Sequence, residues 1–314
     1  QVENERLKHV MTQVRKSVNE GTALHLAIRE HPRVFPDVYA NMVEAGEKSG
    51  TLELVFARLA DFVEAQVRLN SKVVSALIYP VVMIAVSLIV VSALMIFVVP
   101  QMVDVIVEQG GDLPWITEAL IAVSETFVSY WWLMLLLMIG GGWGFKRWKR
   151  TPKGRHSWHR IVLRLPIAGR LTRKIVIARF SRTLGTLLSS GVPLLNALDI
   201  AKSVSDNAVY EELIENARTA IRDGAGIADS LRGSDKFPPM VLQMIAVGEK
   251  TGEVEQMLDR VAASYELQAD TTISRLMVLM EPFLILFLGT IVAGIVFAIL
   301  LPMLKMNEAL RTSR

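Results

Sequence analysis

No cysteine occurs among the 314 residues of this chain. Disulfide bridges and metal sites built on thiolate ligands are therefore excluded. The sequence also lacks the G-x-S-x-G, H-E-x-x-H and G-x-G-x-x-G patterns of serine nucleophile, zinc and dinucleotide sites. His156 and His159 are close enough in sequence to share a metal, but no cysteine or nearby carboxylate completes such a site. We expect no catalysis, no cofactor and no metal.

Charge is missing from three long apolar runs. Residues 78–99, 127–145 and 282–304 contain no Asp, Glu, Lys or Arg over 22, 19 and 23 positions. Each run is long enough, as a helix, to cross about 30 Å of hydrocarbon. The first run begins too far along the chain to be a signal peptide. We predict an all-α integral membrane protein with three transmembrane helices, at 78–100, 127–145 and 282–304.

Lysine and arginine are absent from residues 101–126, although ten precede the first run, twenty-one lie between the second and third, and three follow the third. Positive residues remain on the cytoplasmic side of a membrane. Residues 1–77 and 146–281 are therefore predicted to be cytoplasmic. The loop 101–126 and the tail 305–314 are predicted to lie on the opposite side.

Acidic residues are absent from Lys146 to Arg182, a segment with thirteen basic residues and two tryptophans. Such a segment is compatible with nucleic acid or with anionic lipid. Because it begins where the second apolar run ends, we favour anionic lipid headgroups and expect no nucleic acid.

Two similar seven-residue stretches occur in the chain, EAGEKSG at 44–50 and AVGEKTG at 246–252. The same offset of 202 residues also superposes Phe35-Pro36 on Phe237-Pro238. Two further proline pairs follow the same offset, Pro80 with Pro282 and Pro100 with Pro302. The chain is therefore predicted to contain two copies of one helical module.

The repeated motif does not have the spacing of a phosphate-binding loop, G-x-x-x-x-G-K-[ST]. It is typical of a joint between two helices, with a lysine in the last turn and a glycine in the left-handed conformation at Gly50 and Gly252. The charged residues of the two joints are either solvated or in contact with a partner; they are Glu47, Lys48, Glu249 and Lys250.

Helix signals divide the second module into about six helices, at 179–190, 193–203, 207–222, 227–231, 238–250 and from 253 onward. The first module begins at the counterpart of the third of these helices, so we expect the chain to be a shortened form of a longer protein. After its joint, residues 52–79 are predicted to form one helix, with Pro80 permitting a kink. A stripe of apolar residues on this helix is predicted to face the core: Leu52, Val55, Phe56, Leu59 and Val63.

The segment Lys72-Val73-x-x-Ala76-Leu77-x-Tyr79-Pro80, followed by Val98-Val99-Pro100, resembles the signature of the type II secretion system protein F family. That family includes the inner-membrane platform proteins of type IV pili. The resemblance extends over nearly the whole chain. One departure is Glu281, which stands where the first copy has Tyr79. Glu281 is either a hydrated interfacial residue or a helix contact.

The resemblance implies a non-enzymatic platform in the bacterial inner membrane, with a cytoplasmic N-terminal part and a periplasmic C-terminus. Its implied partners are a hexameric cytoplasmic ATPase, membrane-bound adaptor proteins, pseudopilins and further copies of itself. Residues 301–307 resemble the secretion branch more than the pilus branch, which remains the alternative. A transporter subunit driven by an ATPase is a third possibility, but it requires polar residues along the spans, and these are nearly absent.

Overall fold

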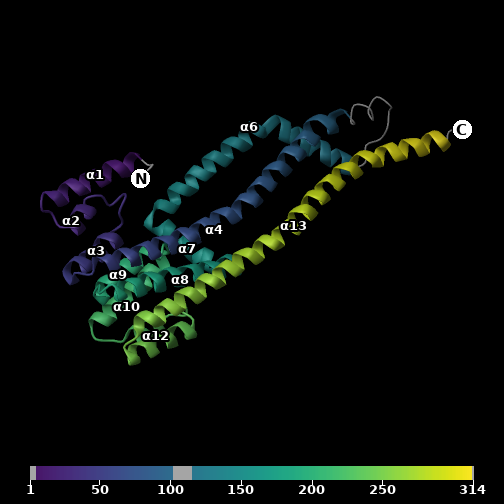
Figure 1. Ribbon diagram of the computed structural model, residues 1–314. Helices are drawn as coiled ribbons and strands as arrows, with labels where there is room; N and C mark the ends of the chain where they lie inside the picture. The colour runs from purple at the N-terminus through teal and green to yellow at the C-terminus, as the bar shows by residue number, and fades with distance from the viewer. Residues whose placement is uncertain (1–4, 102–114, 313–314) are drawn as a thin grey trace. The chain divides into compact units, whose positions relative to one another are not determined.

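A computed structural model describes the backbone of residues 5–101 and 115–312, and most side chains up to Leu300. Within these residues every regular element is a helix. The described chain is therefore all-α, as predicted. Its contacts divide it into two units, one formed by residues 1–72 and 152–272 and the other by residues 73–151 and 273–314 (Figure 1).

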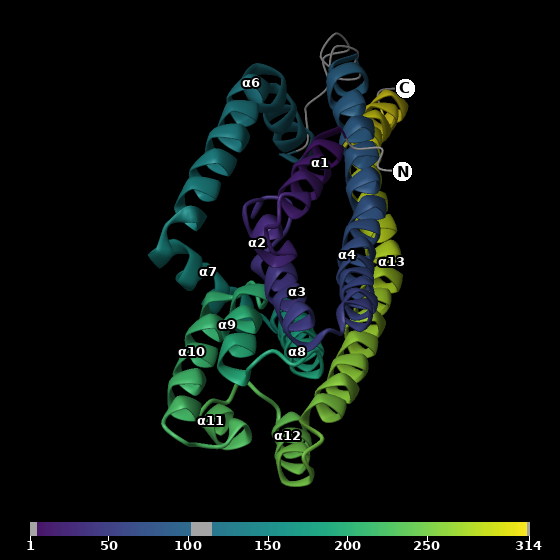
Figure 2. The same ribbon diagram turned by 60° about the vertical axis from the view of Figure 1, so that its left-hand side comes forward.

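Three helices of the first module lie entirely within the described residues of the first unit: α1 (Glu5–Asn19), α2 (Leu24–Arg29) and α3 (Asp37–Ser49). They are drawn in purple and dark blue in Figure 2. Their small core joins two residues of α1 to two of α2 and two of α3: Val10, Val14, Ala27, Ile28, Ala40 and Val43. Helix α4 (Leu52–Ala93) begins in this unit and continues into the other.

The second module contains α7 (Pro152–Arg164), α8 (Ala168–Ser189), α9 (Leu194–Val204), α10 (Ala208–Arg222), α11 (Ile227–Arg232), α12 (Pro239–Thr251) and the start of α13 (Val254–Thr312). The bounds of α9 to α12 agree with the prediction to within one residue. Helix α8 begins eleven residues before the predicted Arg179, and α7 is not predicted at all. Both differences fall in the basic segment, where lysines and arginines interrupt the apolar pattern.

One hydrophobic core joins the two modules. Val38 and Met42 of α3, with Val55 and Phe62 of α4, belong to the same cluster as the core of the second module. The corresponding face of α12 is open, because Met240 and Val247 are 60% and 51% exposed. The two copies of the module are therefore related in sequence but differ in what covers them.

The predicted stripe on α4 is only partly correct. Val55 is 1% exposed and Leu52, Leu59 and Val63 are half-buried, but Phe56 is 45% exposed. Its counterpart, Leu258, is fully buried where α8 crosses α13 closely at Gly185.

Three long helices carry the predicted spans. Helix α4 passes through Pro80 without interruption and is longer than the predicted 52–79. Helix α6 (Trp115–Arg150) begins inside the predicted loop, so residues 115–126 are helical. Among the residues that the structure describes, two segments are long and apolar enough to cross a membrane, Leu52–Gln101 and Val254–Ala298. The third span, in α6, stays a prediction.

A short π-helical turn, η1 (Leu94–Val98), follows α4 and ends next to Pro100. In this turn the N–H of Val99 bonds to the carbonyl of Leu94. The next hydrogen bond of this kind would run from the backbone nitrogen of residue 100 to the carbonyl of Met95. Residue 100 is a proline, so it has no N–H to donate. The buried hydroxyl of Ser124 in α6 donates to that carbonyl instead, at 2.8 Å. Pro100 thus creates an acceptor that links η1 to α6.

A second hydroxyl in the same unit links α6 to α13. Thr117 is buried and donates to the carbonyl of Ala298 at 2.6 Å. Met95 and Val99 also share a small apolar cluster with Ile295 of α13. Polar and apolar contacts together therefore connect the three long helices.

Candidate functional site

The joint between α3 and α4 and its copy between α12 and α13 form the first candidate site. Gly50 and Gly252 have φ angles of 73° and 76° and end α3 and α12 in the left-handed conformation, as predicted. The following backbone N–H closes each turn, from Thr51 to Gly46 and from Glu253 to Gly248, both at 2.9 Å. These bonds satisfy carbonyls that would otherwise be free at the helix ends.

The first glycine of each motif has a different role. A Cβ atom added to Gly46 would lie 2.9 Å from Cγ2 of Val55, and one added to Gly248 would lie 2.8 Å from Cα of Val254. Only glycine therefore allows the two helices of each joint to approach so closely. The sequence repeats this glycine, but repetition alone does not show that the reason is steric.

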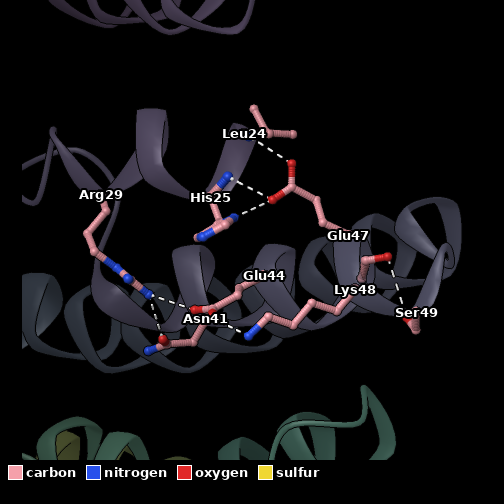
Figure 3. Close-up of polar contacts among 9 residues, drawn as sticks. Leu24, His25, Arg29, Asn41, Glu44, Glu47, Lys48 and Ser49 are labelled. Carbon is pink, nitrogen blue, oxygen red and sulfur yellow. Dashed lines mark hydrogen bonds and ion pairs between the residues drawn. The ribbon is translucent and has the colours of Figure 1, made fainter. Parts of the chain in front are cut away.

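The glutamate of each motif binds the start of a neighbouring short helix. Glu47 accepts hydrogen bonds from the N–H groups of Leu24 at 2.7 Å and His25 at 3.3 Å, and it also contacts the ring of His25 (Figure 3). Glu249 accepts from the N–H groups of Ile227 and Ala228. Neither α2 nor α11 has a capping side chain of its own. The carboxylates therefore supply the missing N-terminal caps.

The environment of Glu47 changes its acidity. Burial alone would raise the pKa of Glu47, but the hydrogen bonds from His25 and from the N–H groups of Leu24 and His25 outweigh it and lower the pKa. Glu47 is thus held in the charged form that the cap requires. Both glutamates point into the module, so contact between them and a partner protein stays a prediction.

The lysines are the exposed part of the motif. Lys48 is 74% exposed and lies 2.7 Å from Glu44, which also accepts from Arg29 at 3.0 Å. The hydrogen bonds from Lys48 and Arg29 lower the pKa of Glu44. Lys250 is exposed and makes no ion pair with any residue that the structure describes. Contact of either lysine with a partner remains a prediction.

The first joint faces the second module. Lys48 and Ser49 line a groove of about 330 Å³ with the turn from Ser190 to Asn196, which connects α8 to α9. The surface around Lys48 therefore borders the second module, whereas Lys250 lies on α12 next to the exposed Val247.

A charged cleft between α4, α8 and α13 is the second candidate site. It has a volume of about 720 Å³ and is lined by six acidic residues and three arginines. Arg182 lies 3.0 Å from Glu266 and 2.7 Å from Asp259. Burial alone would lower the pKa of Arg182, but these two carboxylates raise it. Lys72 of α4 and Asp270 of α13 form an ion pair that joins the two long helices directly.

The other predicted site residues lie on the long helices. Pro80 is buried within α4, while Glu281 and Pro282 are exposed on α13. Pro100 follows η1, and the side chain of Pro302 lies outside the described residues. These residues are not brought together into one site.

The two histidines of the basic segment have separate partners. His156 lies 3.1 Å from Glu212, and Nδ1 of His159 accepts from the N–H of Ala208 at 2.9 Å. Both therefore attach α7 to the start of α10, an arrangement that the sequence analysis missed. The two partners, the carboxylate of Glu212 and the N–H of Ala208, lie 56 and 49 residues away and are not visible as a local motif.

Comparison with known proteins assigns the chain to a family. The family described as type II secretion system (T2SS), protein F, matches residues 1–100 and 180–302. The type IV pilus assembly protein PilC of Thermus thermophilus is 40% identical over 306 residues, which are 97% of this chain and 75% of that protein. The type II secretion system protein F of Pseudomonas aeruginosa is 40% identical over 305 residues, with the same two coverages. The chain therefore belongs to the type II secretion system protein F family.

Proposed function

We propose that this chain is an inner-membrane platform protein of a type II secretion system, which couples a cytoplasmic ATPase to pseudopilus assembly. One structural observation supports this proposal in addition to the family membership. The last helix of each module continues without a break into an apolar run, over 42 residues in α4 and 59 residues in α13. A helix transmits displacement along its axis because its backbone hydrogen bonds resist stretching. Work done on the modules is thereby delivered to the membrane helices.

The proposed arrangement has seven parts: cytoplasmic modules at 1–77 and 146–281, spans at 78–100, 127–145 and 282–304, a periplasmic loop at 101–126 and a periplasmic tail at 305–314. The distribution of lysine and arginine supports this orientation. The ion pairs between α4, α8 and α13 support a mechanical role, because they join the two long helices before the spans begin.

The proposed partners follow from this arrangement. The ATPase and the membrane-bound adaptor contact the cytoplasmic modules, pseudopilins contact the spans, and further copies of the chain complete a homo-oligomer. The platform itself performs no catalysis in this proposal. Lys250 and the open face of α12 are the part of the second joint available for such contacts.

A platform for a type IV pilus is the second candidate function. Relatives named for pilus assembly and for type II secretion are equally similar, at 40% identity. Complementation distinguishes the two: the chain restores protein export to a strain that lacks its secretion platform, but not piliation to a strain that lacks its pilus platform. The opposite result assigns it to the pilus.

Labelling of single cysteines in intact cells tests the orientation. The chain has no cysteine, so each substitution provides one reactive site. With a reagent that cannot cross the inner membrane, Asp112→Cys should react and Asp223→Cys should not. Asp223 is a suitable cytoplasmic position because its side chain is 70% exposed. Asn207 is less suitable, since it is buried as the cap of α10. The reverse labelling pattern would refute the proposed topology.

A further inference from the structure

Helix α7 has two faces with different partners. Its inward face contains the buried Leu163 and also His159, which accepts a hydrogen bond from the N–H of Ala208. The basic side chains beside them meet the first turn of α10, since Arg155 pairs with Glu211 and His156 lies 3.1 Å from Glu212. The acidic residues near the start of α10 are therefore already paired with side chains on the inward face of α7.

The outward face of α7 and the turn after it carry basic and apolar side chains together: Lys153, Arg160, Ile161, Arg164, Leu165 and Ile167. The three basic residues are exposed and make no ion pair within the described part of the chain. Ile161, Leu165 and Ile167 are 49%, 48% and 57% exposed. We refer to these six residues as the α7 outer face.

We propose that the α7 outer face binds anionic phospholipid headgroups and inserts its apolar side chains into the membrane interface. This inference rests on the proposed function, because it requires α6 to be a span. Helix α6 ends at Arg150 and α7 begins at Pro152, with one residue between them. The predicted span ends at residue 145, and α6 continues for five more residues, about 7.5 Å, before the two steps of about 3.8 Å that lead to Pro152. Helix α7 therefore begins within about 15 Å of the end of that span.

The composition of the face selects lipid over other polyanions. Lysine and arginine near a membrane surface are attracted by acidic headgroups, and neighbouring apolar side chains gain by leaving water for the acyl boundary. Binding of nucleic acid would explain the basic residues, but it would not explain three exposed aliphatic side chains beside them. An acidic protein surface is the remaining alternative, and the experiment separates it from lipid.

Spin labelling of the full-length protein in nanodiscs tests the proposal. Ile161→Cys carries a nitroxide, with Asp223→Cys as the control in the same cytoplasmic unit. Nanodiscs contain phosphatidylcholine alone or with phosphatidylglycerol, and no partner protein is present. Collisions with oxygen and with a water-soluble nickel complex report the depth of the label. In nanodiscs with phosphatidylglycerol, the nitroxide at position 161 should collide often with oxygen and rarely with the nickel complex. The control nitroxide at position 223 should collide readily with the nickel complex.

Charge reversal provides the second arm. Arg160→Glu with Arg164→Glu should abolish the protection at position 161. Arg222→Glu with Arg232→Glu removes two exposed arginines elsewhere in the module and should leave it intact. High salt should also weaken the protection, because it screens the headgroup charge.

Two outcomes would overturn the proposal: equal exposure of positions 161 and 223 in both lipids, or protection that does not depend on phosphatidylglycerol. The assay does not depend on secretion. Failure of the labelling pattern in cells would refute the proposed orientation, while failure in nanodiscs of a correctly oriented protein would refute only the lipid site.

Discussion

At the scale of single residues, each position of the repeated motif has its own physical task. Gly46 and Gly248 allow close approach, Glu47 and Glu249 cap a neighbouring helix, and the final glycine adopts the left-handed conformation. The left-handed glycines can be predicted from the sequence because their position after a lysine-containing turn is a local signal. The inward glutamates cannot, because their partners lie more than twenty residues away.

The two glycines of the second joint should differ in sensitivity. The Cβ that Gly252→Ala adds would have no other atom within 4 Å. This variant should therefore lose only the stability that a non-glycine residue costs in the left-handed conformation, about 1 kcal/mol. Gly248→Ala places its Cβ against the backbone of Val254, so the joint must open and the loss of stability should be larger. Denaturant unfolding of the purified protein in detergent measures both. Equal losses would show that close approach is not the reason for the first glycine.

The cap at α2 should depend on pH. The folded-state pKa of Glu47 is lowered. Its stabilisation is therefore fully present above the unfolded pKa and is lost as the pH falls through the lowered folded value. The protection of the amides of Leu24 and His25 from hydrogen exchange, relative to the intrinsic rate at each pH, should fall over that acidic range. Glu47→Gln should give faster exchange at these two amides at neutral pH and should remove the pH dependence of their protection. If the variant kept the same pH dependence, a group other than Glu47 would be responsible for it.

At the scale of elements, the sequence predicts helices well where end signals accompany an apolar face and poorly where the inner face of a helix is polar. The bounds of α9 to α12 follow from proline, asparagine and glycine at their ends. Helix α7 also begins at a proline, Pro152, but its inner face carries Arg155, His156 and His159 and is defined by their contacts with α10. The exposure of Phe56 was also unpredictable, because periodicity identifies an apolar face but does not show whether another helix covers it.

The matched positions Phe56 and Leu258 should respond differently to truncation. Leu258→Ala removes a fully buried side chain beneath α8 and should cost about 2–5 kcal/mol. Phe56→Ala alters a side chain that is 45% exposed and should cost less than half as much, since little packing is lost. Thermal unfolding of the two variants under identical conditions provides the comparison. Similar losses would imply that Phe56 is covered in the folded protein.

The hydroxyl of Ser124 should stabilise the contact between α6 and η1. Ser124→Ala leaves the carbonyl of Met95 without its donor and should cost about 0.6–1.7 kcal/mol, the range for such bonds in membrane proteins. Ser129→Ala in the same helix is the control, because Ser129 is exposed. Unfolding in detergent by a titrated denaturant compares them. If the control lost as much stability, the π-helical turn would not depend on this bond.

At the scale of the whole molecule, two modules end in two long helices that are tied together within the first unit. Lys72 pairs with Asp270 and Arg182 connects α8 to Asp259 and Glu266, so the parts of α4 and α13 that belong to the first unit are held by charge as well as by a shared core. The apolar runs and the repeat were evident from the sequence. The ion pairs were not, because they join residues separated by 77 to 198 positions.

The central claim is that α4 acts as a continuous rod between the cytoplasmic module and the membrane. It is tested by replacing residues 73–75 with Gly-Pro-Gly, or with Ala-Ala-Ala as the matched control, and measuring export of a secreted substrate in living cells. The first replacement weakens the helix by about 5 kcal/mol relative to the second, while both keep its length. With equal amounts of each variant in the membrane, Gly-Pro-Gly should reduce export at least tenfold and Ala-Ala-Ala should not. Export at the control level from the Gly-Pro-Gly variant would contradict the account.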